Sequence, residues 1–388
     1  MVEINKNIFN KVIKPSLLNL KLLLKDLFKS NHKIYSNELH LKGGIDWLIN
    51  AQKITQDGGV SSSYSLIFGW RPSYPETSGY IIPTLFDYYH LTNEKHYLEI
   101  CKEIADWECS IQLKEGAFQG DNIDKERKAI VFNTGQVILG LIRAFKELKN
   151  NNYLDCAHKA GEFLVKNQEI DGNWIKNSFN NVAHTYNVRT AWALLELFLI
   201  TKEMKFKEAA TKNLNWALDQ KNENHWFFKN SFKRNEIPLL HCISYTIRGF
   251  LEAGIILKSE KFKDVALKSS LKLLNYYEKN NFLPARFNSK WQSHDFYSCL
   301  TGDAQLSLIW LKLYQIYNNK RFLINAIRLN NYLKLKQVVD HKFKEINGAI
   351  KGSDPIWGRY NPFSFPNWAT KFFCDTLMIE KKILSKMN

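Results

Sequence analysis

Four polar residues with acid, base or hydrogen-bonding side chains stand at matching points along the chain. Glu76, Asn133 and His184 each directly precede a threonine, and His241 directly precedes Cys242. Each point begins a strongly apolar stretch, which is typical of a buried helix. Titratable groups are costly to bury without partners, so their convergence on one layer favours a functional site over a set of helix caps. Carboxyl and imidazole groups of this kind carry out general acid–base chemistry.

Residues three, four and seven positions further along a helix share the face of the first residue, which extends this layer. The groups expected to transfer protons are His184, His241, Tyr186, Tyr245, Glu76 and Asp303. The groups expected to bind substrate include Asn133, Gln136, Asn187, Arg189, Arg248 and Tyr80. Lys351 and Trp357 join them from a long loop ahead of the last apolar helix, where extra chain would lie at the mouth of the site.

A repeat of helical hairpins positions these residues. An amphipathic helix that ends in a glutamine recurs along the chain, and Gln52, Gln112, Gln168 and Gln220 are 60, 56 and 52 residues apart. Gln337 follows after 117 residues, two repeat lengths, and the run 261–279 supplies the helix between them. A turn-rich loop and a nearly all-apolar helix follow each amphipathic helix. Six such hairpins predict an all-α (α/α)₆ toroid with the apolar helices inside.

Two parts of the chain are expected: an amphipathic, basic, helical extension over residues 1–36 and a single toroid over residues 37–388. Lys21, Lys25 and Lys29 interrupt the leucines of the extension, so it lacks the apolar core of a signal peptide. No apolar stretch is long enough to span a bilayer. Packing of the extension against the toroid is favoured over contact with a membrane surface.

Composition narrows the class of partner. The net charge is +16, but the lysines are spread over all the helices and no nucleic-acid-binding module is recognisable. The sequence therefore predicts a basic, solvated surface and no nucleic-acid partner. The six cysteines form no CxxC pair and no zinc-ligand spacing, which indicates a reducing, cytoplasmic setting without a metal or cofactor.

The polarity of the inner helices favours an anionic ligand. All six would begin at one mouth, where their free N–H groups and dipoles attract negative charge. Arg189, Arg248 and Lys371 would add positive charge. The expected partner is therefore an acidic oligosaccharide or polysaccharide.

Six segments read together resemble the VpsJ-like exopolysaccharide-biosynthesis proteins. They are 74–80 (YPETSGY), 132–136 (FNTGQ), 184–187 (HTYN), 299–305 (CLTGDAQ), 350–358 (IKGSDPIWG) and 365–369 (FPNWA). The likeness runs from about Gly43 to Asp375, although the family tends to carry Asp where this chain has Asn133. It implies a six-hairpin glycosidase-like fold and a role in bacterial surface-polysaccharide synthesis, beside other assembly proteins. Gln305, within one of these segments, joins the expected substrate-binding residues.

The reaction stays open at this stage, because this fold hosts many chemistries. A uronate lyase or C5-epimerase that uses a His or Tyr base is favoured. A glycoside hydrolase would use the two carboxyl groups of Glu76 and Asp303. A sugar 2-epimerase would use paired histidines. A fourth hypothesis is a non-catalytic glycan-binding or scaffold subunit of a polysaccharide assembly complex.

Overall fold

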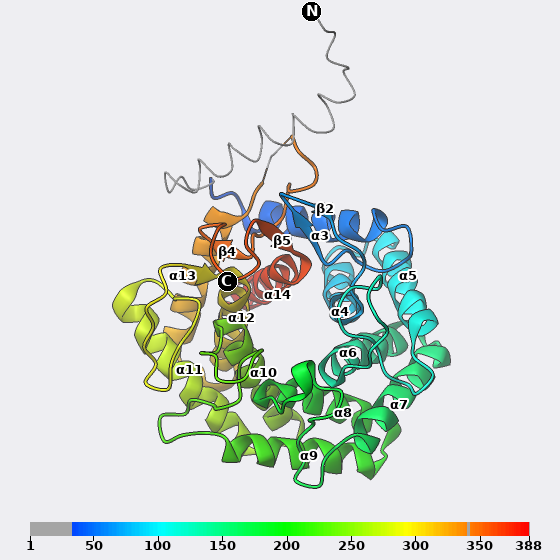
Figure 1. The fold of residues 1–388 in the computed structure, drawn as a ribbon. Helices are drawn as coiled ribbons and strands as arrows, with labels where there is room; N and C mark the ends of the chain where they lie inside the picture. Colours follow the sequence, from blue (N-terminus) through cyan, green and yellow to red (C-terminus); the bar gives the residue numbers. More distant parts are fainter. Residues whose placement is uncertain (1–32, 340–341, 388) are drawn as a thin grey trace, which may run out of the picture.

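The computed structural model describes residues 33–339 and 342–387, so most of the predicted N-terminal extension lies outside the described residues. The described residues form twelve α-helices arranged as a ring of six hairpins (Figure 1). The outer ring consists of α3 (Asn37–Lys53), α5 (His96–Ile111), α7 (Asn151–Lys166), α9 (Met204–Asp219), α11 (Glu260–Asn280) and α13 (Lys320–Lys336). The inner ring consists of α4 (Pro75–Thr92), α6 (Val131–Leu148), α8 (Val188–Thr201), α10 (Leu240–Ile256), α12 (Leu300–Tyr317) and α14 (Asn367–Leu384). The predicted all-α (α/α)₆ toroid is confirmed.

The two rings differ in burial as their sequences require. On α6 every residue from 131 to 142 is buried, because the helix contacts α4 and α8 in the inner ring and α7 in the outer ring. On α9 the buried residues recur at intervals of three and four, which places them on one face. Within residues 33–339 and 342–387, no helix combines the length and the apolar character that a bilayer span needs.

The ring closes where the last inner helix meets the first hairpin. Helix α14 packs against both α3 and α4. Strand β1 (Ser63–Ser65) pairs antiparallel with β5 (Ser364–Pro366) on one side and with β2 (Gly69–Trp70) on the other. The Asn367 amide donates hydrogen bonds to the Ser61 carbonyl at 2.9 Å and to the Thr77 hydroxyl at 2.8 Å. The first and last repeats are therefore joined by backbone pairing as well as by packing.

Four of the repeated glutamines, Gln52, Gln112, Gln168 and Gln337, join one hairpin to the next, whereas Gln220 donates within its own helix. The Gln112 amide donates to the carbonyl of Gly116 in its own loop at 2.9 Å and to that of Cys156 on the next outer helix at 2.8 Å. The last member, Gln337, donates to the carbonyl of His40 on α3 at 3.0 Å. The sequence period that revealed the hairpins therefore marks the contacts that hold the outer ring together.

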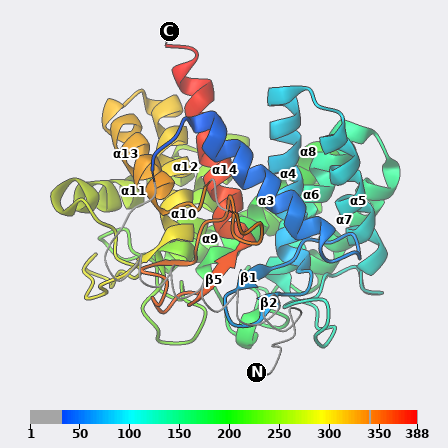
Figure 2. The same cartoon turned by 90° about the horizontal axis from the view of Figure 1, so that it is seen from above.

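The loops that precede the inner helices gather at one end of the ring. Strands β1, β2 and β5 lie at that end, and the last turns of α14 project from the opposite end (Figure 2). Two further short strands, β3 (Ser298–Cys299) and β4 (Ser353–Asp354), pair antiparallel between the fifth and sixth loops. The inner helices consequently begin around one mouth and end around the other.

Replacing Gly140 with alanine is expected to destabilise the protein by about 1–3 kcal/mol, the usual cost of overpacking a core. A Cβ atom at Gly140 would stand 2.1 Å from the carbonyl oxygen of Gly79 on the neighbouring inner helix. Denaturant unfolding measures the difference. Gly43→Ala on α3 is the matched control, because its Cβ atom would meet no heavy atom nearer than 3.6 Å. Equal stability of the two variants would contradict a tight contact between α4 and α6.

Candidate functional site

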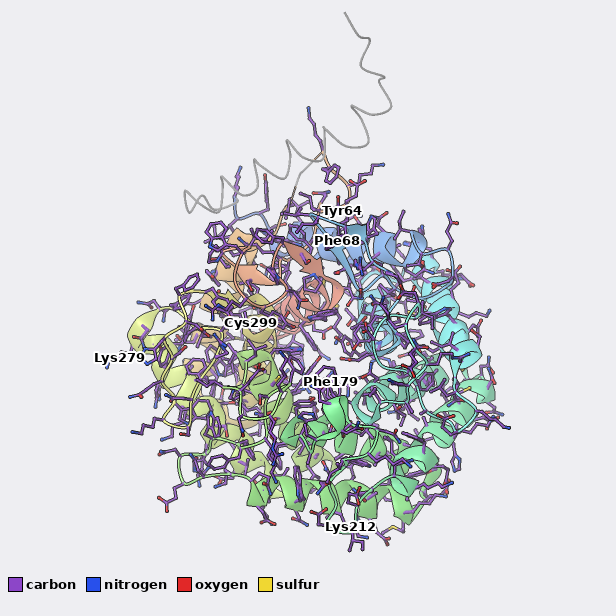
Figure 3. The ribbon with its side chains drawn as sticks, viewed as in Figure 1. Tyr64, Phe68, Phe179, Lys212, Lys279 and Cys299 are labelled. Atoms are coloured by element: carbon purple, nitrogen blue, oxygen red, sulfur yellow. The ribbon has the colours of Figure 1, made fainter. Side chains whose placement is uncertain are left out.

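A cavity of about 220 Å³ opens where the inner helices begin. Its wall is mostly aromatic: Tyr74, Tyr80, Phe132, Phe179, Tyr186, Phe232, Tyr245, Tyr360 and Trp368. Its other lining side chains are Glu76, Asn133, His241 and Asn361. Figure 3 shows Phe179 beside the centre of the ring. Aromatic faces surrounding a few hydrogen-bonding groups suit a ring-shaped, hydroxylated ligand.

Glu76 is the carboxyl group of this cavity. It lies in the first turn of α4, and its Oε2 accepts a hydrogen bond from the Tyr74 hydroxyl at 2.7 Å. The Asn133 amide in turn donates to the Tyr74 hydroxyl at 3.3 Å. Burial raises the pKa of Glu76 to about 7, although the Tyr74 hydrogen bond and the Arg189 charge act in the opposite direction. A carboxyl with this pKa can give or take a proton at neutral pH.

His241 is the imidazole of this cavity. Burial lowers its pKa to about 3, and the Arg189 charge acts in the same direction, so the ring is neutral near pH 7. The Gln305 amide nitrogen on α12 lies 2.6 Å from His241 Nδ1, and because an amide nitrogen only donates, this contact favours the tautomer with the ring proton on Nε2. Within the described residues, no hydrogen bond is formed by Nε2. His241 therefore offers an N–H donor to the cavity.

The two groups approach the cavity from opposite sides of the inner ring. Helices α4 and α10 are the first and fourth of six inner helices, and each inner helix contacts only its ring neighbours extensively. Phe132, Tyr186 and Tyr245 line the same cavity, and the Phe132 ring packs against Tyr186 and Tyr245 with centroids 5.2 and 5.0 Å apart. A ligand on this aromatic floor would have Glu76 on one side and His241 on the other.

Six of the predicted site residues line this cavity. They are Glu76, His241, Tyr186, Tyr245, Asn133 and Tyr80. Gln305 lies behind His241 and orients its ring, a positioning role rather than the predicted contact with substrate. The structure therefore brings predicted residues of α4, α6 and α10 to one cavity.

His184 is not part of the cavity, contrary to its predicted placement. Its ring stacks on Tyr186 with centroids 4.5 Å apart, and its Nε2 lies 2.8 Å from the Phe179 carbonyl. A 3₁₀ turn (Thr185–Asn187) separates it from α8, so it does not occupy the first helical turn as Glu76 does. Burial lowers its pKa. His184 holds the loop around Phe179, and Asn187 does the same through a 3.4 Å hydrogen bond to Ser178.

Asp303 also lies outside the cavity. It is fully buried. Its charge contributes to the raised pKa of Tyr277 on α11 and of Tyr332 on α13, so it lies near these outer helices. Its carboxylate oxygens have no hydrogen-bond partner among the described residues. Burial, with the charge of Asp354, raises its pKa well above the ordinary value. A neutral carboxyl between the inner and outer rings cannot act across the cavity from Glu76.

The predicted cations lie elsewhere too. Arg189 and Arg248 line a second cavity further along the inner helices, and Gln136 accepts a hydrogen bond from Arg189 Nε. Lys351 is buried against Asp354, with its Nζ 2.8 Å from a carboxylate oxygen. Trp357 is half-buried and packs against the core. The aromatic cavity therefore has no lysine or arginine among its described lining residues.

Several lining residues were not predicted from the sequence. Phe179 and Phe232 come from the loops before α8 and α10, and Tyr360 comes from the loop before α14. The Trp368 indole donates to the Tyr360 hydroxyl at 2.8 Å, which fixes both rings at the mouth. Loop residues carry no helical period, so only their aromatic character, within turn-rich segments, could have singled them out.

A separate groove of about 790 Å³ is lined by residues that flank Phe179 and Phe232 in the sequence, including Asn181, His184, Ser231 and Lys233. Phe179 and Phe232 themselves line the aromatic cavity, where their rings pack with centroids 6.0 Å apart. The groove is lined by aromatic Trp226 and Phe228 and by the cations Lys229, Lys233 and Arg234, beside the single acid Glu236. These lysine and arginine side chains therefore lie outside the aromatic cavity.

One group of potential metal ligands occurs in the described part of the chain. His158, Glu162 and Glu203 come together on the outer surface of α7 and at the start of α9. Lys205 forms ion pairs with both glutamates there. This cluster is remote from the aromatic cavity, and its charge is already offset.

No protein-family model and no curated protein matches this chain. Solved structures do. An unsaturated glucuronyl hydrolase specific for heparin superposes with a TM-score of 0.71 at 14% identity, over 89% of this chain and 97% of the other. A cellobiose 2-epimerase from Spirochaeta thermophila gives 0.69 at 13% identity, over 97% and 99%. A sugar epimerase from a ruminal bacterium gives 0.68 at 13% identity, over 87% and 98%. At these identities the likeness shows the shared six-hairpin fold alone.

The free energy of unfolding is expected to fall as pH rises through the pKa of Glu76. The folded state holds this proton up to about pH 7, against an ordinary value of 4.5, so folding favours the protonated form. Between about pH 5 and about pH 8 the wild type should lose about 2–3 kcal/mol more than Glu76→Gln. Denaturant unfolding of both proteins at the two pH values tests this. Parallel pH profiles would contradict the raised pKa.

Proposed function

We propose that this protein is a carbohydrate-active enzyme that removes and returns a proton at a sugar carbon next to a carbonyl or carboxyl group. The observation that carries the proposal is the pairing of Glu76 and His241 in one aromatic cavity. The carboxyl has a pKa of about 7 and the imidazole is neutral. A carboxylate base opposite a neutral imidazole donor is a known arrangement for enolisation.

The proposed reaction uses these two side chains and, for epimerisation, a proton from solvent. Ionised Glu76 takes the proton from the carbon, and the electrons of the C–H bond move towards the carbonyl oxygen. The Nε2–H of His241 donates a hydrogen bond to that oxygen as negative charge develops on it. Delivery of a solvent proton to the opposite face of the carbon, while Glu76 releases the abstracted proton to solvent, gives the epimer. Return to the neighbouring carbon, with the matching hydroxyl proton shift, gives the isomer. No electrons are gained or lost overall.

The geometry favours this chemistry over glycoside hydrolysis. Hydrolysis by the usual route needs two carboxyl groups that flank the scissile bond. Glu76 is the single carboxyl among the described lining residues of the cavity, and Asp303 lies between the rings. A His base from α8 is likewise disfavoured, because His184 is bonded to the Phe179 loop.

The proposed substrate is a glycan whose terminal unit reacts in the cavity while its other units extend along the groove. The cavity offers no cation to neutralise a uronate carboxylate, so a sugar carbonyl is favoured over a uronate as the reacting group. The groove cations Lys229, Lys233 and Arg234 support an acidic chain beyond that unit. The names of the structural neighbours, two sugar epimerases and a glucuronyl hydrolase, support a carbohydrate ligand.

The cellular role is the broadest part of the proposal. It rests on the resemblance to the VpsJ-like proteins, which implies bacterial exopolysaccharide synthesis in company with other assembly proteins. The expected cytoplasmic location also remains a prediction. A non-catalytic glycan-binding subunit would use the same cavity and groove, and activity measurements separate it from an enzyme.

The protein is incubated with reducing and uronate-containing oligosaccharides in D₂O. NMR is expected to show solvent deuterium at the carbon next to the carbonyl. Glu76→Gln should lower kcat by about 10²–10⁴-fold because it removes the base. His241→Asn should lower kcat by about 10²–10³-fold because it displaces the donor.

Asp303→Asn is the matched control for this experiment and should keep the wild-type kcat, since Asp303 does not line the cavity. New reducing ends that depend on both Glu76 and Asp303 would instead support a hydrolase. An unsaturated uronate would support a lyase. Tight binding without deuterium incorporation or product would leave the binding-module hypothesis standing.

Substitution of both Lys233 and Arg234 by glutamine tests the groove. For an acidic oligosaccharide the double variant should raise KM severalfold and leave kcat unchanged, because these cations lie outside the cavity. Added salt should weaken wild-type binding of the acidic chain more than binding by the variant. A neutral oligosaccharide of equal length is the control ligand. Equal loss for both oligosaccharides would exclude the groove as an electrostatic subsite.

A further inference from the structure

A second cavity, of about 250 Å³, lies deeper in the toroid towards the ends of the inner helices. It includes Asp87 on α4, eleven residues beyond Glu76, which corresponds to about 16 Å along the helix axis. Tyr80 contributes to the walls of both cavities and separates them. The proposed sugar chemistry does not use this second cavity.

Arg189 is the buried charge of the second cavity. Only 3% of its surface is exposed, and its Nε donates to the Gln136 side-chain oxygen. Its guanidinium carbon lies 4.9 Å from the centroid of Tyr245 and 5.2 Å from that of Trp192, and Tyr80 and Phe372 are also within 6 Å. No ion pair to Arg189 is formed by the described residues.

The carboxylates around this cavity are already matched with other cations. Asp375 accepts from Lys371 at 2.6 Å and from Thr84 at 2.7 Å. Glu252 accepts from both Arg248 and Lys312 at 2.5 Å.

The outer part of the cavity follows the same pattern. Asp87 pairs with Arg143 at 2.8 Å, and Glu196 pairs with Lys146 at 3.0 Å. The carboxylates beside Arg189 are therefore paired with other cations, and none of them forms an ion pair with Arg189.

We propose that the second cavity binds a small oxyanion, a phosphate or a carboxylate group, with Arg189 as its anchor. Arg248 and Lys371 line the same cavity and add positive charge beside it. A buried cation without a counter-charge carries a large desolvation cost, and an anion offsets that cost. The guanidinium group presents paired N–H donors that match two oxygens of such an anion.

The aromatic rings around Arg189 do not replace an anion. Ring contacts engage the face of the guanidinium, where the π electrons attract the cation. The N–H donors lie in its plane, and only Nε is bonded to a described residue. The terminal Nη1 and Nη2 groups have no hydrogen-bond partner among the described residues and are not fully enclosed. They are therefore accessible from the cavity.

Titration of the full chain with inorganic phosphate, and separately with acetate, tests the proposal by calorimetry and thermal unfolding. Sodium chloride at matched ionic strength is the reference. Saturable binding of either anion, with a rise in Tm, is expected. Arg189→Gln should weaken that binding by about tenfold or more, because it removes a charge-assisted pair of hydrogen bonds. Arg328→Gln, an exposed arginine on α13, is the matched control and should bind as the wild type does.

Two further variants keep the test decisive. Arg248→Gln leaves Glu252 paired with Lys312 and should weaken binding severalfold even if Arg189→Gln does not fold. Glu76→Gln should bind the anion normally, because Glu76 lines the other cavity. The proposal is overturned if neither anion binds more tightly than chloride. It is also overturned if folded Arg189→Gln binds like the wild type, or if Glu76→Gln abolishes binding.

Discussion

Closure of the inner ring is the constraint on which the rest of this structure depends. Helices that are apolar on nearly every side cannot end a row, because an end helix would expose one face to water. Helix α14 removes that problem by packing on α4 and α3. The β1–β5 pairing, the Asn367 amide and the reach of Gln337 to His40 fasten the same seam. Residues some 300 positions apart in the sequence thus become neighbours.

Closure also gives the lumen two ends of different chemistry. At the mouth where the inner helices begin, aromatic rings exclude water from one carboxyl and one imidazole. Burial disfavours charge on both, so it raises the pKa of Glu76 and lowers that of His241. The deeper end is rich in ion pairs, with Arg189 between the two. One scaffold thereby keeps neutral proton-transfer groups apart from a concentration of fixed charge.

The six-hairpin fold is shared with hydrolases and epimerases, so function has to be argued from the site. The arrangement of the site differs from the expected one in two respects. The proposed base is Glu76 rather than a histidine, since the Gln305 contact favours His241 as a hydrogen-bond donor. The expected cations Arg189, Arg248 and Lys371 line the second cavity instead, and Lys233 and Arg234 line a separate groove.

The sequence by itself determined the toroid, because glutamine spacing and all-apolar helices are local patterns that six hairpins repeat. It also determined that Glu76 and His241 begin two inner helices. Only the tertiary structure decided which side chains share a space. Positions i+3 and i+4 on a helix diverge by about 100°, so Tyr80 and Tyr245 enter the cavity while Asp303 faces the outer ring. The 3₁₀ turn before α8 turned His184 away, and loop packing, which has no period, brought in Phe179 and Tyr360.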